Sequence, residues 1–198
     1  MSDLRVHKTK YINETKRVSF KYDGKNYFGY EGDTLASALL ANGVHLIGRS
    51  FKYHRPRGIM SCGSEEPNAI CQISDKNDLT EPNVRATELE IYDGLEAFSQ
   101  NCWPNVKFDI GGINNLISPL IPAGFYYKTF MWPKSFWKKV YEPLIRMSAG
   151  LGKSPTEPDP DIYDHKYVHY DVLVIGGGLS GIISAKIAAK SNLKTLLV

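Results

Sequence analysis

The sequence predicts an α+β domain of the β-grasp type, followed by the first β-α-β unit of an α/β domain of the Rossmann type. Two observations carry this prediction: a hairpin-and-helix pattern near the amino terminus, and a strand, a glycine turn, a helix and a strand in that order at the carboxyl terminus. We expect the chain to divide into a β-grasp domain (1–100), an aromatic and basic connector (101–152), a proline-rich linker (153–170) and the truncated start of the Rossmann-type domain (171–198).

The first predicted strand alternates apolar and polar residues. Val18, Phe20 and Tyr22 lie on one face of it, and the pair Asp23-Gly24 that follows is a common two-residue turn. A second aromatic run continues over residues 27–30. The pattern predicts a β-hairpin.

A short helix is predicted directly after the hairpin. Asp33 or Thr34 can cap its amino end, and Gly43 lies where a left-handed residue commonly ends a helix. Its apolar face is expected to carry Leu35, Leu39 and Leu40.

Further strands are expected at Val44–Ile47, Ala69–Ser74 and Arg85–Tyr92. A hairpin, a helix and scattered short strands together are typical of the ferredoxin-like β-grasp fold. We therefore expect residues 1–100 to form one such domain.

The last part of the chain predicts a β-α-β unit. The apolar run Val172–Ile175 is typical of a strand covered on both faces, and a helix is expected from about Leu179 to Ser191. Asn192 closes this helix, and Thr195–Val198 begins a second, parallel strand.

Three glycines lie between the strand and the helix. Gly176, Gly178 and Gly181 form the pattern G-x-G-x-x-G. The first glycine allows a tight turn, the second lets the backbone approach a pyrophosphate, and the third lets the helix pack on the strand. The amino end of the helix adds unpaired N–H groups and the positive end of a dipole. This context predicts a site for a dinucleotide.

The acid that binds the ribose of a dinucleotide is expected about 20 residues beyond the glycines, at or just past Val198. Two parallel strands and one helix cannot bury their apolar faces alone. We therefore expect the chain to be the front part of a longer polypeptide, or to have its sheet completed by a partner chain.

Composition sets limits on the function. The net charge of +3 is too small to indicate a nucleic-acid-binding protein, and we expect none of its partners to be nucleic acid. No apolar stretch is long enough to span a membrane, and the amino terminus lacks the apolar core of a signal peptide. We expect a cytoplasmic protein with reduced thiols and no membrane contact.

Residues 124–152 interleave aromatic side chains with lysines. One interpretation is a partly buried connector whose lysines reach water along their aliphatic stems. The other is a docking surface, because aromatic residues are enriched at protein interfaces.

The three cysteines do not follow a [2Fe–2S] pattern, although many β-grasp domains hold such a cluster. Plant-type spacing is C-x4-C-x2-C with a later fourth cysteine. Counted from Cys62, the next ligands would lie at Pro67 and Ile70, and Cys71 and Cys102 are out of register. We expect no [2Fe–2S] cluster and no metal site.

The stretch FKYHRPRGIMS, residues 51–61, is basic. Arg55 and Arg57 could pair bidentately with the phosphate of a flavin or dinucleotide, or the loop could simply be solvated. His45 and His54 lack a second ligand at metal spacing, so we expect ordinary polar or packing roles for both. No residue in the chain is predicted to be catalytic.

Four long blocks of the sequence are distinctive: GDTLASALLANGVHLIGRSFKYHRPRGIMSCGSEEPNA, RATELEIYDGLEAFSQNCWPNVKFDIG, SPLIPAGFYYKTFMWPKSFWKKVYEPLIR and YDVLVIGGGLSG. Together they resemble a known family, the alpha subunit of heterotetrameric sarcosine oxidase. The resemblance runs from about Val18 to Val198 and implies the amino-terminal fragment of such a subunit.

The resemblance also implies an activity and its cofactors. The holoenzyme converts sarcosine, tetrahydrofolate and O2 to glycine, 5,10-methylenetetrahydrofolate and H2O2. NAD is implied at the alpha dinucleotide site, with FAD and covalent FMN associated mainly with the beta subunit, and with gamma and delta subunits as further partners. Only the turn transfers residue by residue, to Gly176, Gly177, Gly178, Leu179, Ser180 and Gly181.

Two alternatives stay open at the level of sequence. The chain could belong to a related flavin-dependent amine or opine dehydrogenase, which would hold FAD at the same turn. It could also be a β-grasp interaction module without catalysis.

Overall fold

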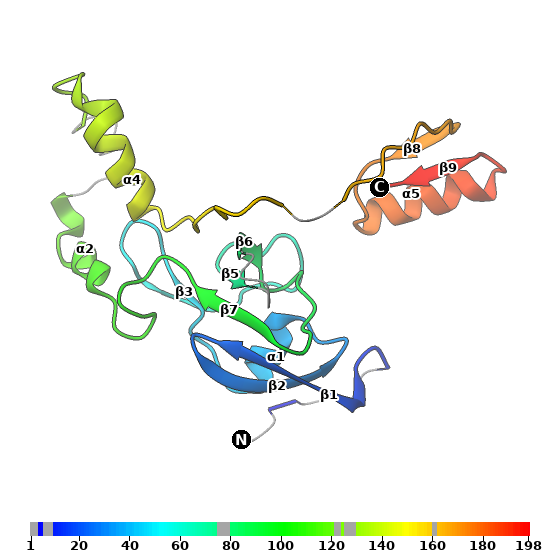
Figure 1. The fold of residues 1–198 in the computed structure, drawn as a ribbon, viewed down its shortest axis with the longest axis horizontal. Coiled ribbons are helices and arrows are strands. Elements are labelled where there is room, and N and C mark those ends of the chain that lie inside the picture. The colour runs from blue at the N-terminus through cyan, green and yellow to red at the C-terminus, as the bar shows by residue number, and fades with distance from the viewer. Residues whose placement is uncertain (1–3, 6–9, 75–79, 121–123, 125–129, 160–161) are drawn as a thin grey trace. The chain divides into compact units, whose positions relative to one another are not determined.

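The computed structural model describes residues 4–5, 10–74, 80–120, 124, 130–159 and 162–198. The chain forms two compact units, Met1–Pro158 and Asp159–Val198. Figure 1 shows the elements of each unit.

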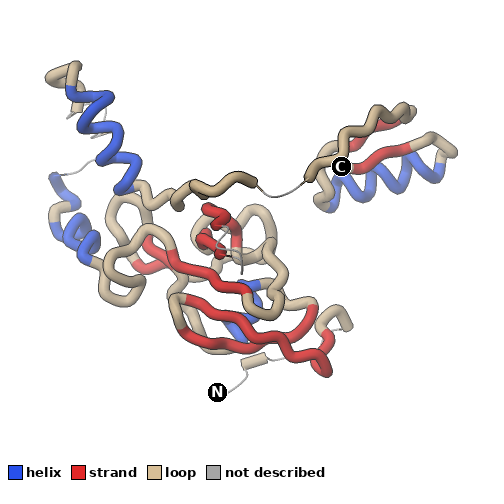
Figure 2. The backbone as a smooth tube through the Cα atoms, in the orientation of Figure 1, coloured by secondary structure: helices blue, strands red, loops and turns tan. Residues whose placement is uncertain are grey.

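A five-stranded sheet forms the centre of the first unit. Its strand order is β2-β1-β7-β5-β6, and β1 is parallel to β7 while the other neighbouring pairs are antiparallel. Figure 2 shows these strands as the red segments of the tube. The strands are β1 (Asn13–Tyr22), β2 (Lys25–Glu31), β5 (Ile70–Ser74), β6 (Thr80–Arg85) and β7 (Leu95–Ser99).

The hairpin of β1 and β2 is confirmed. Asp23 and Gly24 connect the strands with φ values of 47° and 73°, as a two-residue turn with both central residues left-handed requires. The Asp23 carboxylate also accepts hydrogen bonds from the backbone N–H and the hydroxyl of Ser99, at 2.8 and 3.0 Å. The turn is thereby tied to β7, the strand that lies next to β1.

The predicted helix is α1 (Leu35–Ala41), and it supplies much of the core. Thr34 caps it by accepting a hydrogen bond from Ser37 N at 3.2 Å, and Gly43 is left-handed with φ 74°. The prediction for Leu40 was wrong, because this side chain is exposed while the alanines of the helix face the sheet. The largest fully buried apolar side chains of the domain are Phe20, Leu35, Leu39, Ile47 and Leu95.

The later strands were predicted only in part. β5 lies within the predicted range, but Val44–Ile47 is not a strand, and β6 ends at Arg85, where a strand was predicted to begin. The run after Arg85 turns instead, with Glu88 N and Leu89 N donating to Arg85 O. Ile47 is nevertheless fully buried, so its apolar character reflects core packing without strand pairing.

Short elements follow the sheet in the described part of the connector. They are η1 (Ile110–Gly112), α2 (Ile113–Leu116), η2 (Ser118–Leu120), η3 (Trp137–Tyr141) and α4 (Glu142–Ser148). Of the aromatic and lysine-containing stretch 124–152, residues 125–129 lie outside the described residues. Several aromatic side chains in the described part are exposed, among them Trp132, Phe136 and Trp137.

The second unit is the predicted β-α-β arrangement. It consists of β8 (Val172–Val174), α5 (Leu179–Lys190) and β9 (Thr195–Leu197), and β8 is parallel to β9. Asn192 ends the helix in a left-handed conformation, with φ 59°. None of the helices formed by the described residues is long and apolar enough to cross a membrane.

Candidate functional site

The glycine turn joins β8 to the amino end of α5. Gly176 is left-handed, with φ 103°, and its N–H donates to Val198 O at 2.6 Å. Gly178 is the residue before the first turn of α5 and has an extended backbone, with φ −70° and ψ 176°. The first N–H groups of a helix have no partner within it, so the turn presents donors and a positive dipole end to an anion.

The glycines of the turn differ in the space that a Cβ atom would meet. A Cβ at Gly181 would lie 1.9 Å from Gly176 O, so helix and turn meet too closely there for any side chain. Gly177 and Gly178 have open space where a Cβ would stand. Their lack of a side chain is therefore not needed for packing within this chain, and it leaves the backbone accessible from outside.

The six residues predicted to bind the dinucleotide lie in one continuous turn. Leu179 and Ser180 open α5 and are exposed, and so are Gly176, Gly177 and Gly178, while Gly181 is half-buried against the turn. Their role in binding stays a prediction.

The three cysteines differ in their exposure to solvent. Cys62 is exposed in the loop before β5, Cys71 is buried in β5, and Cys102 is half-buried with its Sγ 3.3 Å from Ser99 Oγ. Burial raises the pKa of the Cys71 thiol to about 12. Within the described ranges, no three His, Cys, Asp or Glu side chains come together in a geometry that could hold a metal ion.

We expect the cysteines to differ sharply in reactivity. Cys62 should be modified quickly by a thiol reagent at about pH 8, while Cys71 should stay unmodified because its high pKa leaves almost no thiolate. Mass spectrometry of partly labelled peptides measures both rates. A Cys62→Ser variant should lose the fast phase, and denaturant should make Cys71 reactive; labelling of both at similar rates in the folded chain would contradict this.

The basic loop lies between β3 (Gly48–Arg49) and β4 (Pro56–Arg57). The cations of Lys52 and Arg55 each lie 4.8 Å from the centre of the Tyr53 ring, and Arg55 Nε donates to Asn115 Oδ1 at 2.8 Å. Arg57 is exposed on β4. Pairing of Arg55 and Arg57 with a phosphate stays a prediction.

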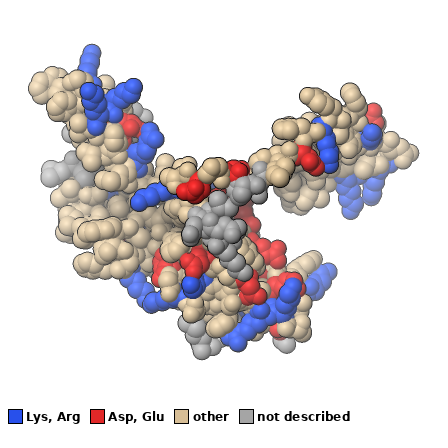
Figure 3. Space-filling view, in the orientation of Figure 1, with Lys and Arg blue, Asp and Glu red and all other residues tan. Residues whose placement is uncertain are grey.

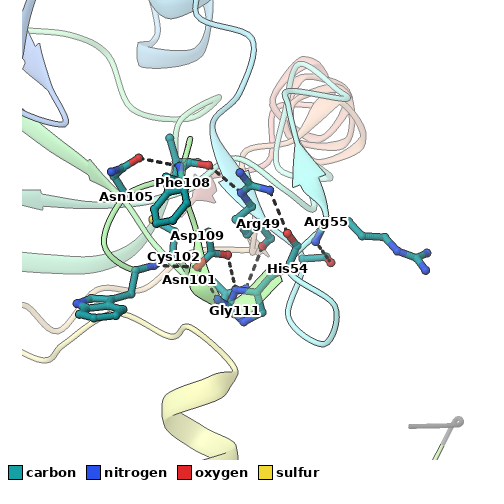
Figure 4. Close-up of polar contacts among 12 residues, drawn as sticks. Arg49, His54, Arg55, Asn101, Cys102, Asn105, Phe108, Asp109 and Gly111 are labelled. Atoms are coloured by element: carbon teal, nitrogen blue, oxygen red, sulfur yellow. Dashed lines mark hydrogen bonds and ion pairs between the residues drawn. The ribbon is translucent and has the colours of Figure 1, made fainter. Parts of the chain in front are cut away.

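A buried histidine–aspartate pair closes this loop against the connector (Figure 4). His54 Nδ1 lies 2.6 Å from Asp109 Oδ2, and the side chains are 11% and 1% exposed. Asp109 Oδ1 accepts hydrogen bonds from Trp103 N and Gly111 N, at 3.0 and 3.2 Å. The His54 ring fills the space beside Gly111, where a Cβ would lie 2.3 Å from its Nδ1. His54 thus has the polar packing role that was expected.

Arg49 organises the same region through the backbone. Its guanidinium donates to the carbonyl oxygens of His54, Val106 and Lys107 at 2.8 to 3.2 Å. This role could not be predicted from sequence, since the three acceptors are backbone atoms, two of them more than 50 positions away. An open cavity of about 210 Å³ beside Arg49 and Arg57 is smaller than most ligand pockets.

Comparison with known proteins identifies the relatives of this chain. Residues 15–102 match the family described as a 2Fe-2S iron-sulfur cluster binding domain. Over all 198 residues the chain is 53% identical to the sarcosine oxidase subunit alpha of Rhizobium meliloti (strain 1021). The chain is homologous to the amino-terminal region of sarcosine oxidase alpha subunits.

Two further sarcosine oxidase alpha subunits show the same relation. Those of Corynebacterium sp. strains U-96 and P-1 are 30% and 32% identical over 189 residues, 94% of this chain. The chain spans 20% of the length of the Rhizobium sarcosine oxidase subunit and 15% of the two Corynebacterium subunits. A crystal structure of L-proline dehydrogenase from P. horikoshii is similar over 92% of this chain and 24% of that one, with 18% identity and a TM-score of 0.43, too low to inform function.

Residues 15–102 match a ferredoxin-like family model, but the donor set of this chain does not fit a [2Fe–2S] cluster. Such a cluster takes four cysteine thiolates, and this chain has three cysteines, of which Cys71 points into the core. That no cluster is bound stays a prediction.

Proposed function

We propose that the chain is the amino-terminal part of a sarcosine oxidase alpha subunit. The complete enzyme would oxidatively demethylate sarcosine, converting sarcosine, tetrahydrofolate and O2 to glycine, 5,10-methylenetetrahydrofolate and H2O2, in the cytoplasm. The observation that carries this proposal is the 53% identity to such a subunit over all 198 residues, which include both units of the chain. Identity of that extent covers the ferredoxin-like domain, the connector and the glycine turn alike.

Within the alpha subunit, the glycine turn would hold the pyrophosphate of NAD or FAD. Gly176, Gly177, Gly178, Leu179, Ser180 and Gly181 form the proposed site. The first N–H groups of α5 would donate to the phosphate oxygens, and the open space at Gly177 and Gly178 would let the pyrophosphate approach the backbone. A bound dinucleotide would supply redox chemistry, while these residues bind and orient it.

The ferredoxin-like domain and the connector would supply contacts to beta, gamma and delta subunits, with FAD and FMN held in the holoenzyme. Exposed aromatic side chains at Trp132 and Trp137 support this role, since surface aromatics are enriched at interfaces. Figure 3 shows several basic side chains gathered over the segment that Figure 1 labels α4. The elements η3 and α4 carry Lys138, Lys139 and Arg146.

A substrate panel on the assembled enzyme tests this proposal. Sarcosine should reduce the flavin and yield H2O2, with methylenetetrahydrofolate formed when tetrahydrofolate is present. Reduction by opines or other secondary amines, but not by sarcosine, would favour the related amine or opine dehydrogenase. A complex that assembles normally with the other subunits yet oxidises none of these would favour a β-grasp interaction module.

A further inference from the structure

A buried carboxylate lies at the centre of the loop before β5. The Glu66 side chain is 1% exposed, although its neighbour Glu65 is fully exposed to solvent. Glu66 Oε2 accepts hydrogen bonds from Met60 N and Ser61 N, at 2.7 and 2.6 Å. Its Oε1 accepts from Asn68 N and Ala69 N, at 2.8 and 3.2 Å.

Most of the hydrogen-bond donors to this carboxylate are backbone N–H groups. Besides the N–H groups, Ser61 Oγ donates to Oε2 at 3.3 Å. Across the described residues, no lysine, arginine or histidine forms an ion pair with Glu66. Burial opposes the charge of Glu66, but the N–H groups of Ser61, Asn68, Met60 and Ala69 hold the pKa of the carboxyl below its ordinary value. The loop is therefore built around an anion.

Converging backbone N–H groups of this kind form the anion-binding concavities found at many iron–sulfur sites. The loop also lies within the part of the chain that matches a 2Fe-2S cluster binding family. Counted from Cys62, plant-type spacing would place the next ligands at Pro67 and Ile70. Positions 62 and 70 bracket Glu66 and two of its N–H donors, those of Asn68 and Ala69, while the other two donors, those of Met60 and Ser61, directly precede Cys62.

We propose that the Glu66 carboxylate takes the place of the cluster as the anion of this loop. The loop closes on a side chain of its own, so the ferredoxin-like domain folds without iron. This proposal reconciles the match to a 2Fe-2S family with cysteines that do not fit a cluster. The loop keeps an anion-binding site, and the Glu66 carboxylate of the chain itself occupies it. Glu66 acts as a positioning residue that fixes the path from β4 to β5.

Thermal unfolding of the full chain carrying Glu66→Gln tests this proposal. An amide presents its NH2 group to donors and cannot accept at both ends, so buried N–H groups lose their acceptor. We expect the Tm at neutral pH to fall by roughly 10 °C or more. The matched control is Glu81→Gln, which removes the charge of an exposed carboxylate on β6 and should leave the Tm nearly unchanged.

The charge of Glu66 gives a second readout, the pH dependence of the Tm. A variant that only created a cavity or changed the shape of the side chain would not alter this dependence. The folded-state pKa is lowered, so the stabilisation is present above the ordinary glutamate pKa and is lost as pH falls through the folded pKa. The Tm difference between the parent chain and Glu66→Gln should therefore shrink in acid. The other titratable groups of this loop, Glu65 and Cys62, are common to both proteins and cancel in the difference.

Reconstitution with iron and sulfide tests the proposal on the parent chain, without a variant. After anaerobic treatment with ferrous iron and sulfide, the desalted parent chain should carry no stoichiometric iron, show no visible charge-transfer band and keep its Tm. A stoichiometric cluster in the parent chain would overturn the proposal, and so would a Glu66→Gln chain as stable as Glu81→Gln at neutral pH. A Glu66→Gln chain that fails to fold while Glu81→Gln folds would support it.

Discussion

Replacing Gly178 by alanine should weaken dinucleotide binding by the assembled enzyme by about 10- to 100-fold while leaving the glycine turn intact. The loss corresponds to hydrogen bonds to a charged group, each worth about 1.5–3 kcal/mol. Gly178 has an extended backbone and open space where its Cβ would stand, so the chain itself tolerates a methyl group. That methyl group would occupy the space into which the pyrophosphate must come. Nucleotide content after denaturation and a binding titration measure the effect.

Two other glycines serve as comparisons for this variant. Gly181→Ala should impair both the turn and the binding, because its Cβ would lie 1.9 Å from Gly176 O. Gly112→Ala makes the same chemical change at a helical glycine of the other unit, where a Cβ would also find open space, and should alter neither. A Gly178→Ala enzyme that binds the dinucleotide like the parent would contradict the proposed role of the turn.

Replacing Asp33 by alanine should lower the free energy of unfolding by about 3–5 kcal/mol, the usual cost of removing one partner of a buried ion pair. The Asp33 side chain is fully buried, and its Oδ1 accepts from Arg5 Nη1 at 2.9 Å and Ser37 Oγ at 2.8 Å. Its Oδ2 accepts from Tyr30 N at 2.9 Å and from Arg5 Nη2. The variant would remove the buried carboxylate that pairs with the Arg5 cation at the junction of β2 and α1.

Urea unfolding of the full chain, followed by circular dichroism, measures this change. Glu31→Ala is the matched control, because Glu31 is an exposed carboxylate paired with Lys16 and such pairs add little to stability. Equal midpoints for the two variants would show that the buried pair of Asp33 and Arg5 does not hold the amino-terminal segment to the domain.

Local signals explain what the sequence predicted well. The turn Asp23-Gly24, the cap at Thr34 and the glycines at 176–181 each act over a few residues, and each appears in the structure where it was expected. Leu40 was misplaced because an apolar residue at the edge of a helical face can lie on either side of the boundary with solvent. The alanines of α1 pack against the sheet in its place.

Features that depend on distant pairing could not be predicted. β7 was missed because LEAFS becomes a strand by pairing with β1, about 75 residues away, and with β5. The contact of His54 with Asp109 joins residues 55 positions apart. From the sequence alone, Glu66 is indistinguishable from an ordinary surface acid in a polar loop. Its burial and its role as a hydrogen-bond acceptor depend on the path of the backbone around it.

Hydrogen–deuterium exchange at the glycine turn is the most direct test of the central claim, that this turn is the dinucleotide-binding part of an alpha subunit. The measurement compares the backbone amides of residues 176–182 in the assembled enzyme with the dinucleotide bound and after its removal. We expect bound NAD or FAD to slow exchange at these amides, with little change at α1 of the ferredoxin-like domain. Unchanged exchange at 176–182 in an enzyme that demonstrably holds its dinucleotide would contradict the claim.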